Sequence, residues 1–268
     1  MIGICTDSHS LMPSVLAERY GIEVVPLTVS VDGREYLEGV DLDPDSFYDL
    51  YTDDHKPVSE CCEPSSGQFA AAYEELVNRG CKQIMSIHSS GLVIGALNAA
   101  RLAAHTAAVP VRLIDSRTVR FGVSCCVWAA AEALQGGASL DEAAEIAESV
   151  APRLGNVFII DGLQLLDVPQ HAGTIGVWTL VDEEVQPLAK VGSIVDAVNV
   201  MAERALGWGD RLKLGVGTAH RECGPIGEAL LHAVGESSNV TEVVRYRILP
   251  SAGILTGPGT VSCVMFAE

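Results

Sequence analysis

The chain has 268 residues, and its 17 Lys and Arg against 35 Asp and Glu give a formal net charge of −18. This charge repels phosphate backbones and anionic membrane surfaces, so it disfavours nucleic-acid binding. Hydrophobic residues make up 48% of the chain but aromatic residues only 5%, so we expect a mainly aliphatic interior. The length is sufficient for one large domain or two smaller ones.

The N-terminus lacks a basic region before its first apolar run, and the apolar stretch 121–134 is too short to span a bilayer. We therefore expect a cytoplasmic protein without stable membrane insertion. The 8 cysteines include two adjacent pairs and no CxxC motif. This pattern favours reduced, buried thiols over a disulfide framework or a zinc site.

The first half of the chain alternates strand-like apolar runs with capped helices, which is typical of a parallel α/β sheet. Capping-box spacing occurs at Ser65 with Gln68 and at Ser139 with Glu142. The expected strands are 2–5, 22–31, 83–88 and 111–114. The expected helices begin near Ser10, Asp45, Ser65, Gly91, Gly122 and Ser139.

After Pro152 the pattern changes to strands that pair locally. The expected strands are 156–160, 175–180, 185–188, 213–217, 242–249 and 260–266, the second and third forming a hairpin across Asp182-Glu183-Glu184. Helices are expected at 193–206 and 225–234. The sequence thus predicts an α/β protein of two domains: residues 1–154 with a parallel sheet and residues 155–268 with a mixed sheet.

Polar segments directly follow two of the predicted strands: Thr6-Asp7-Ser8 and Ser89-Ser90-Gly91. Ligands of open α/β sheets usually lie at the carboxyl ends of the strands, and a helix start there can receive a carboxylate or phosphate. Asp and Ser at such positions are equally typical of turns and helix caps. The residues alone leave both interpretations open.

Two cysteine-containing segments are candidates for a reactive thiol or a metal site. Cys61 and Cys62 are expected on a loop before a capped helix, where a thiol can become more acidic, and His55 or His88 could supply a base. His220 and Cys223 could suggest a metal or thiol centre, but a loop before a helix that starts at Pro225 is favoured.

Several short motifs recur together in an order that resembles the bacterial DegV family over nearly the whole chain. They are Thr6-Asp7-Ser8, Val25-Pro26-Leu27, Pro64-Ser65 with Gly67-Gln68-Phe69, Ser89-Ser90, Asp115-Ser116 and Gly257-Pro258-Gly259. The resemblance implies a two-domain α/β protein that binds one long-chain fatty acid, with the head-group site in residues 1–154 and the acyl pocket covered by residues 155–268. Some members present the fatty acid to a separate kinase that phosphorylates it.

The same resemblance assigns the head-group contacts to hydroxyl and thiol side chains. Ser89 and Ser90 stand at the paired-serine position of the family, Ser65 stands in its Thr-Ser-Gln-Pro-Ser segment, and the Thr and Ser of that segment are replaced by Cys61 and Cys62. The family's His before Gly-Pro-Gly is Leu255, and its Gly-Gly-Arg is missing around 167–170.

The resemblance therefore implies a carrier that binds a fatty acid or similar lipid and that, as in some members, can present it to a partner kinase, without catalytic residues, metal ligands or a cofactor. Two alternatives remain at this stage. One is a thiol-dependent enzyme that uses Cys61 or Cys62, and the other is a regulatory protein-interaction subunit with a structural lipid.

Overall fold

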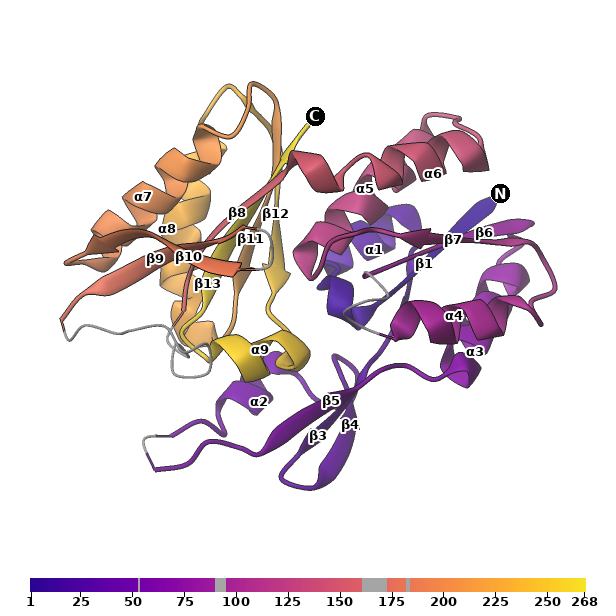
Figure 1. The fold of residues 1–268 in the computed structure, drawn as a ribbon, viewed down its shortest axis with the longest axis horizontal. Helices are drawn as coiled ribbons and strands as arrows, with labels where there is room; N and C mark the ends of the chain where they lie inside the picture. The colour runs from indigo at the N-terminus through magenta and orange to yellow at the C-terminus, as the bar shows by residue number, and fades with distance from the viewer. Residues whose placement is uncertain (53, 90–94, 161–172, 182–183) are drawn as a thin grey trace. The chain divides into compact units, whose positions relative to one another are not determined.

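The computed structural model describes residues 1–52, 54–89, 95–160, 173–181 and 184–268 (Figure 1). Contacts within the chain define two compact units, which we call unit 1 (Met1–Leu42 and Val58–Pro152) and unit 2 (Asp43–Pro57 and Arg153–Glu268). The predicted α/β fold with a parallel sheet first and a mixed sheet second is confirmed. The predicted division into 1–154 and 155–268 stays a prediction; it differs from these units by placing 43–57 and 153–154 with the first part.

Unit 1 is built on a parallel sheet whose described strands run in the order β2-β1-β6-β7. These strands are β1 (Ile2–Asp7), β2 (Glu23–Val25), β6 (Gln83–His88) and β7 (Val111–Asp115). Helices α3 (Ser66–Asn78) and α4 (Ala96–Ala104) lie on one face, and α5 (Phe121–Gln135) and α6 (Leu140–Glu148) lie on the other (Figure 1). Covering both faces buries the strands, as parallel sheets require.

Unit 1 also contains the 3-10 turn η1 (Ser8–Ser10), helix α1 (Ser14–Tyr20) and a small antiparallel sheet. The small sheet has the order β4-β3-β5, with β3 (Thr28–Val31), β4 (Arg34–Leu37) and β5 (Ser59–Cys62). The predicted strand 22–31 is wrong as a single strand because Pro26 lacks an N–H group, and the N–H of Leu27 donates to Ser8 Oγ instead.

Helix starts in unit 1 follow their capping chemistry. Both predicted capping boxes are confirmed: Ser65 accepts from the Gln68 N–H and Ser139 from the Glu142 N–H, with the reciprocal side-chain bonds present. The helix expected from Ser10 is wrong at its start, because Leu11 has a left-handed φ of 55° and the helix begins only at Ser14.

Unit 2 holds a mixed sheet with the described strand order β10-β9-β8-β13-β11-β12. Its strands are β8 (Leu154–Ile159), β9 (Ile175–Val181), β10 (Glu184–Val191), β11 (Leu212–Thr218), β12 (Val240–Arg247) and β13 (Val261–Ala267), preceded by the turn η2 (Ala151–Arg153). Among the described strands of this sheet, only β11 and β12 pair in parallel. Side chains of α7 (Ile194–Leu206) and α8 (Gly224–Gly235) share one hydrophobic core with this sheet.

Unit 2 also contains the 3-10 turn η4 (Arg221–Cys223) and two short helices, α2 (Pro44–Tyr48) and α9 (Pro250–Thr256), the second of which the sequence did not predict. The expected cap Asp45 is wrong: Asp43 accepts from the first N–H groups of α2, while Asp45 Oδ1 pairs with Arg247 Nη2 at 2.6 Å. Tyr48 anchors α2 by donating to the Ile248 carbonyl at 2.8 Å. Over the described residues, every helix is too short or too polar to cross a membrane.

Candidate functional site in unit 1

Buried polar side chains gather at the carboxyl ends of the parallel strands in unit 1. Polar groups removed from water need hydrogen-bond partners, so each of them calls for an explanation. The residues less than 6% exposed at or near this edge are Thr6, Asp7, Ser8, His9, Ser10, Ser86, His88, Ser89 and Ser116. We take this edge as the candidate site.

A series of hydrogen bonds connects α3 to β6 and β1. It runs through the side chains of Tyr73, Ser86, His88 and Asp7, which we call the Asp7–His88 network. Tyr73 donates to Ser86 Oγ at 2.9 Å, and Ser86 Oγ lies 2.7 Å from His88 Nε2. His88 Nδ1 lies 2.6 Å from Asp7 Oδ2. One direction of donation, from Tyr73 through Ser86 and His88 to the carboxylate, satisfies every bond.

The order Ser86, His88 and Asp7 repeats the geometry of a serine-hydrolase triad. Ser86, however, lies inside strand β6 and is 0% exposed, and its oxygen already accepts the Tyr73 hydroxyl. A nucleophile needs access to substrate, so this serine is not placed for acyl transfer. The network instead ties the ends of β1 and β6 together, directly before Ser89.

Ser89 is the predicted site residue with the clearest structural signal. It directly follows β6 and is 1% exposed, and its hydroxyl has no hydrogen-bond partner among the described residues. An unpaired buried hydroxyl costs about 1–3 kcal/mol, so it marks a place where a ligand oxygen would be stabilised. Ser90, the other predicted serine, lies outside the described residues.

His9 and Arg120 meet across the same edge. His9 lies in η1 after β1, and Arg120 is the residue that precedes α5 after β7. Arg120 Nη1 lies 3.1 Å from His9 Nδ1. Burial, with a contribution from the Arg120 charge, lowers the pKa of His9 to about 2, so its ring is neutral. His9 Nε2 has no partner among the described residues.

Ser8 and Glu38 form a second polar pair beside η1. Ser8 Oγ donates to Glu38 Oε2 at 2.5 Å and accepts from the Leu27 N–H at 3.0 Å. Glu38 is 2% exposed. These bonds hold the segment after β2 against the end of β1. They also place the Glu38 carboxylate beside the candidate site.

The structure places Cys61 and Cys62 in β5, the edge strand of the small sheet, so the predicted loop is wrong. Pairing of β5 with β3 accounts for the strand conformation, since Cys61 lies opposite Val29. Partial burial raises the pKa of the Cys61 thiol, and the nearby Arg120 charge lowers it by less. The more acidic thiol expected here is therefore wrong for Cys61.

Two other predicted roles have outcomes in the structure. His88 is committed to Asp7 and Ser86, so it does not serve Cys61 as a base. The Ser65 hydroxyl accepts from the Gln68 N–H at 3.3 Å and donates to Gln68 Oε1 at 3.0 Å, which makes it a helix cap. Its ligand contact stays a prediction, and so do those of Cys61 and Cys62.

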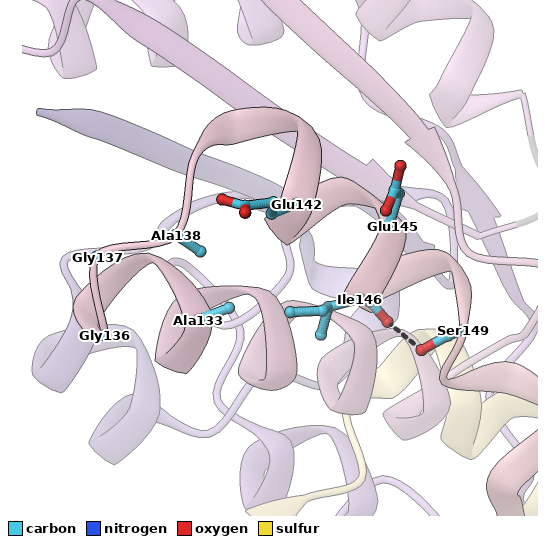
Figure 2. A pocket seen from close by; sticks show the side chains of 8 residues that line it. All are labelled: Ala133, Gly136, Gly137, Ala138, Glu142, Glu145, Ile146 and Ser149. Atoms are coloured by element: carbon cyan, nitrogen blue, oxygen red, sulfur yellow. Dashed lines mark hydrogen bonds between the residues drawn. The ribbon is translucent and has the colours of Figure 1, made fainter.

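A hollow elsewhere in unit 1 lies between α5 and α6 (Figure 2). Its charged lining residues are Glu142 and Glu145, and Ile146 is its largest apolar side chain. The hollow lies near the C-terminal end of α5, whereas Arg120 directly precedes the first residue of this helix. A helix of 15 residues is about 22 Å long. Its acidic lining and its distance separate this hollow from the polar edge.

In unit 2, His220 and Cys223 do not form a chemical centre together. His220 Nε2 bonds to Asp49 Oδ1 at 3.1 Å, and Cys223 Sγ donates to the Pro258 carbonyl at 3.3 Å. The predicted helix start at Pro225 is confirmed, with α8 beginning at Gly224. In the part of the chain that the structure describes, no group of three or more His, Cys, Asp or Glu could hold a metal ion.

Comparison with known proteins decides the family. A family profile described as uncharacterised protein, DegV family, matches residues 1–268. The chain belongs to the DegV family.

Among curated DegV relatives, a DegV domain-containing protein of Streptomyces coelicolor is 34% identical over 175 residues, which are 65% of this chain and 60% of the relative. A relative from Caldanaerobacter subterraneus is 31% identical over 62% of this chain. The chain spans about three fifths of the length of these curated relatives.

Solved structures of DegV proteins share the fold. A protein from Thermus thermophilus described as a fatty-acid-binding DegV family protein has a TM-score of 0.84 and 23% identity, over 100% of this chain and 99% of that chain. A DegV family protein from Eubacterium eligens loaded with heptadecanoic acid has a TM-score of 0.81 and 15% identity, over 100% of both chains. The likeness establishes the DegV fold.

Sequence reasoning missed three residues of the polar edge: His9, Glu38 and Arg120. His9 follows the Thr6-Asp7-Ser8 motif directly, so its place after β1 was a usable signal. Glu38 lies in a region where no element was predicted, and Arg120 reaches His9 across 111 residues of sequence. A spacing of that kind has no local signature.

Proposed function

We propose that this protein binds one long-chain fatty acid or a similar apolar ligand whose head group lies at the polar edge of unit 1. The observation that carries the proposal is the buried hydroxyl of Ser89, which has no hydrogen-bond partner among the described residues. The head-group contacts that we propose beside it are Ser90, Cys61, Cys62 and Ser65. Loop hydroxyls and thiols would orient the head, while apolar surface would hold the tail.

The relatives support the ligand class. Several DegV proteins with this fold are described as fatty-acid binding, and one is loaded with heptadecanoic acid. Burial of a long acyl chain contributes about 0.8 kcal/mol for each CH₂. The tail therefore provides most of the affinity, and the polar edge provides the orientation and selectivity.

We infer a carrier rather than a catalyst, which presents its ligand to a partner kinase. Ser86 is buried and lacks access to a substrate, and partial desolvation raises the pKa of the exposed Cys61 thiol, which therefore stays protonated at neutral pH. Neither group is therefore placed as an activated nucleophile. Retention of a kinase by the ligand-loaded protein in a pull-down, and its loss with the delipidated protein, would support the presentation step.

The first test is mass spectrometry of an organic extract of the purified protein, followed by rebinding of palmitate to delipidated protein. We expect one fatty acid for each chain. Ser89→Ala should weaken palmitate binding about tenfold or more, because it removes a hydrogen bond to a charged head group. Ser149→Ala is the matched control, since Ser149 is exposed on the α6 side of unit 1 and donates to the Ile146 carbonyl within its own turn at 2.8 Å. Absence of lipid and failure to rebind palmitate would refute the proposal.

The double variant Cys61→Ser/Cys62→Ser separates the carrier from a thiol-dependent enzyme. The carrier should retain its lipid, because a serine hydroxyl also donates hydrogen bonds. In the wild type, alkylation of Cys61 by iodoacetamide should be slow at neutral pH and accelerate only as the pH rises above the usual cysteine range, since its pKa is raised. Fast alkylation at pH 7 would instead favour thiol chemistry.

A further inference from the structure

The contact between His9 and Arg120 fixes which ring nitrogen of His9 carries the proton. A guanidinium group has donors only, so at 3.1 Å the Arg120 Nη1 group donates and His9 Nδ1 accepts. A ring that accepts at Nδ1 carries its hydrogen on Nε2. His9 therefore presents an Nε2–H donor that is buried with the rest of the side chain, which is 5% exposed.

That donor has no partner among the described residues. Leaving it unpaired costs about 1–3 kcal/mol, and Arg120 prevents the alternative tautomer that would move the hydrogen to Nδ1. Arg120 itself has the backbone angles φ 55° and ψ −137°, which L residues rarely adopt. The fold thus maintains an unusual backbone conformation at the residue that holds His9.

Sheet topology places His9 and Ser89 at the same edge of the sheet. His9 follows β1 and Arg120 follows β7, while β6 lies between these two strands and ends directly before Ser89. Neighbouring strands are about 4.8 Å apart, so the His9–Arg120 contact spans about 10 Å across the end of β6. Two buried polar groups that have no partner in the described part of the chain, His9 Nε2–H and Ser89 O–H, therefore lie at one sheet edge, where Arg120 adds a positive charge.

We propose that His9 is a ligand contact of this site, where its Nε2–H group donates a hydrogen bond to a head-group oxygen while Arg120 holds the ring in the required tautomer. This inference rests on the proposed function and adds selectivity to it. A carboxylate oxygen accepts the hydrogen bond and gains from the Arg120 charge, whereas an alcohol gains less. The site therefore selects fatty carboxylates over fatty alcohols of the same length.

Binding of palmitate and hexadecanol to delipidated protein tests the selectivity. The wild type should bind palmitate at least about tenfold more tightly than hexadecanol. His9→Phe should lose about tenfold in palmitate affinity, and His9→Gln, whose amide keeps a donor, should recover most of it. Arg120→Met should reduce the preference for palmitate over hexadecanol. His105→Phe is the control, because His105 is exposed in unit 1.

The ring tautomer gives a readout that does not depend on a lipid. Long-range ¹H–¹⁵N spectra of histidine-labelled protein, assigned through His9→Gln, should show the Nε2–H form of His9 in the wild type and a mixture of tautomers in Arg120→Met. An Nδ1–H ring in the wild type would overturn the inference. So would equal palmitate binding by wild type, His9→Phe and Arg120→Met, which would leave the proposed function intact. Failure of the wild type to bind palmitate at all would refute both.

Discussion

His88 Nδ1 lies 2.6 Å from Asp7 Oδ2, and the two side chains are almost fully buried although 81 positions separate them in the sequence. Asp7 ends β1 and His88 ends the neighbouring strand β6. The second Asp7 oxygen accepts from the His9 N–H at 3.0 Å. One carboxylate thus joins the two strand ends and also positions the turn that carries His9.

Asp7→Ala should destabilise the protein by about 3 kcal/mol, because it leaves a buried His88 nitrogen without its partner. Urea unfolding followed by circular dichroism measures the change in the free energy of unfolding. Asp210→Ala, at an exposed position, should change it by less than about 0.5 kcal/mol. Similar stabilities for the two variants would show that the Asp7–His88 contact does not hold the edge.

His9 should make the protein sensitive to mild acid. Burial lowers the pKa of His9 to about 2 in the folded state, against about 6.5 in an unfolded chain. The unfolded state therefore binds the extra proton below pH 6.5, so stability is present above that pH and is lost as the pH falls. Between pH 7 and pH 5 the loss amounts to about 2 kcal/mol.

The measurement is the free energy of unfolding of wild type and His9→Gln at pH 7 and pH 5. The variant should lose about 2 kcal/mol less than the wild type on acidification. His105→Gln replaces an exposed histidine and should follow the wild type. Parallel curves for wild type and His9→Gln would mean that His9 is protonated normally in the folded protein.

Elements of the fold with strong local signals were predictable. Strand β6 was predicted with its observed ends, 83–88, and both capping boxes hold because a serine and an acceptor three residues later act within one helical turn. Prediction failed where partners distant in sequence decide the structure. Cys61 and Cys62 form a strand because β3 pairs with them, and Asp45 is drawn to Arg247 from 202 residues away.

For the candidate site, the sequence predicts where the site lies better than it predicts which side chains form its hydrogen bonds. Strand-to-helix order predicted a polar edge at Asp7 and Ser89, and both lie there. The direction of donation at His9 depends on Arg120, which reaches it only when β1 and β7 are in one sheet. Hydrogen-bond partners assembled by the fold leave no trace in residue spacing.

The two capping boxes allow the role of Ser65 to be tested against an internal control. Ser65→Ala and Ser139→Ala remove the same cap from α3 and α6, so each should cost about 1 kcal/mol of stability. If Ser65 also contacts the head group, only Ser65→Ala should weaken palmitate binding. Equal palmitate affinities for both variants and the wild type would restrict Ser65 to its role as a cap.

Gly253 tests how α2 is held in unit 2. A Cβ atom at Gly253 would overlap the ring and hydroxyl of Tyr48, whose hydroxyl bonds to the Ile248 carbonyl at 2.8 Å. Gly253→Ala should therefore displace Tyr48 and destabilise unit 2 by about 1–3 kcal/mol through overpacking. Limited proteolysis should then cut the segment Asp43–Pro57 faster, since its anchor is Tyr48.

Gly235→Ala provides the matched change, because a Cβ atom there meets nothing within 4 Å. This substitution at the end of α8 should leave stability unchanged or raise it by up to about 1 kcal/mol, since alanine favours helix. If Gly253→Ala is as stable as Gly235→Ala and as resistant to proteolysis, the close approach of α9 to α2 is not what fixes Tyr48. The segment Asp43–Pro57 must then be held by its ion pairs, Asp45 with Arg247 and Asp49 with Arg221.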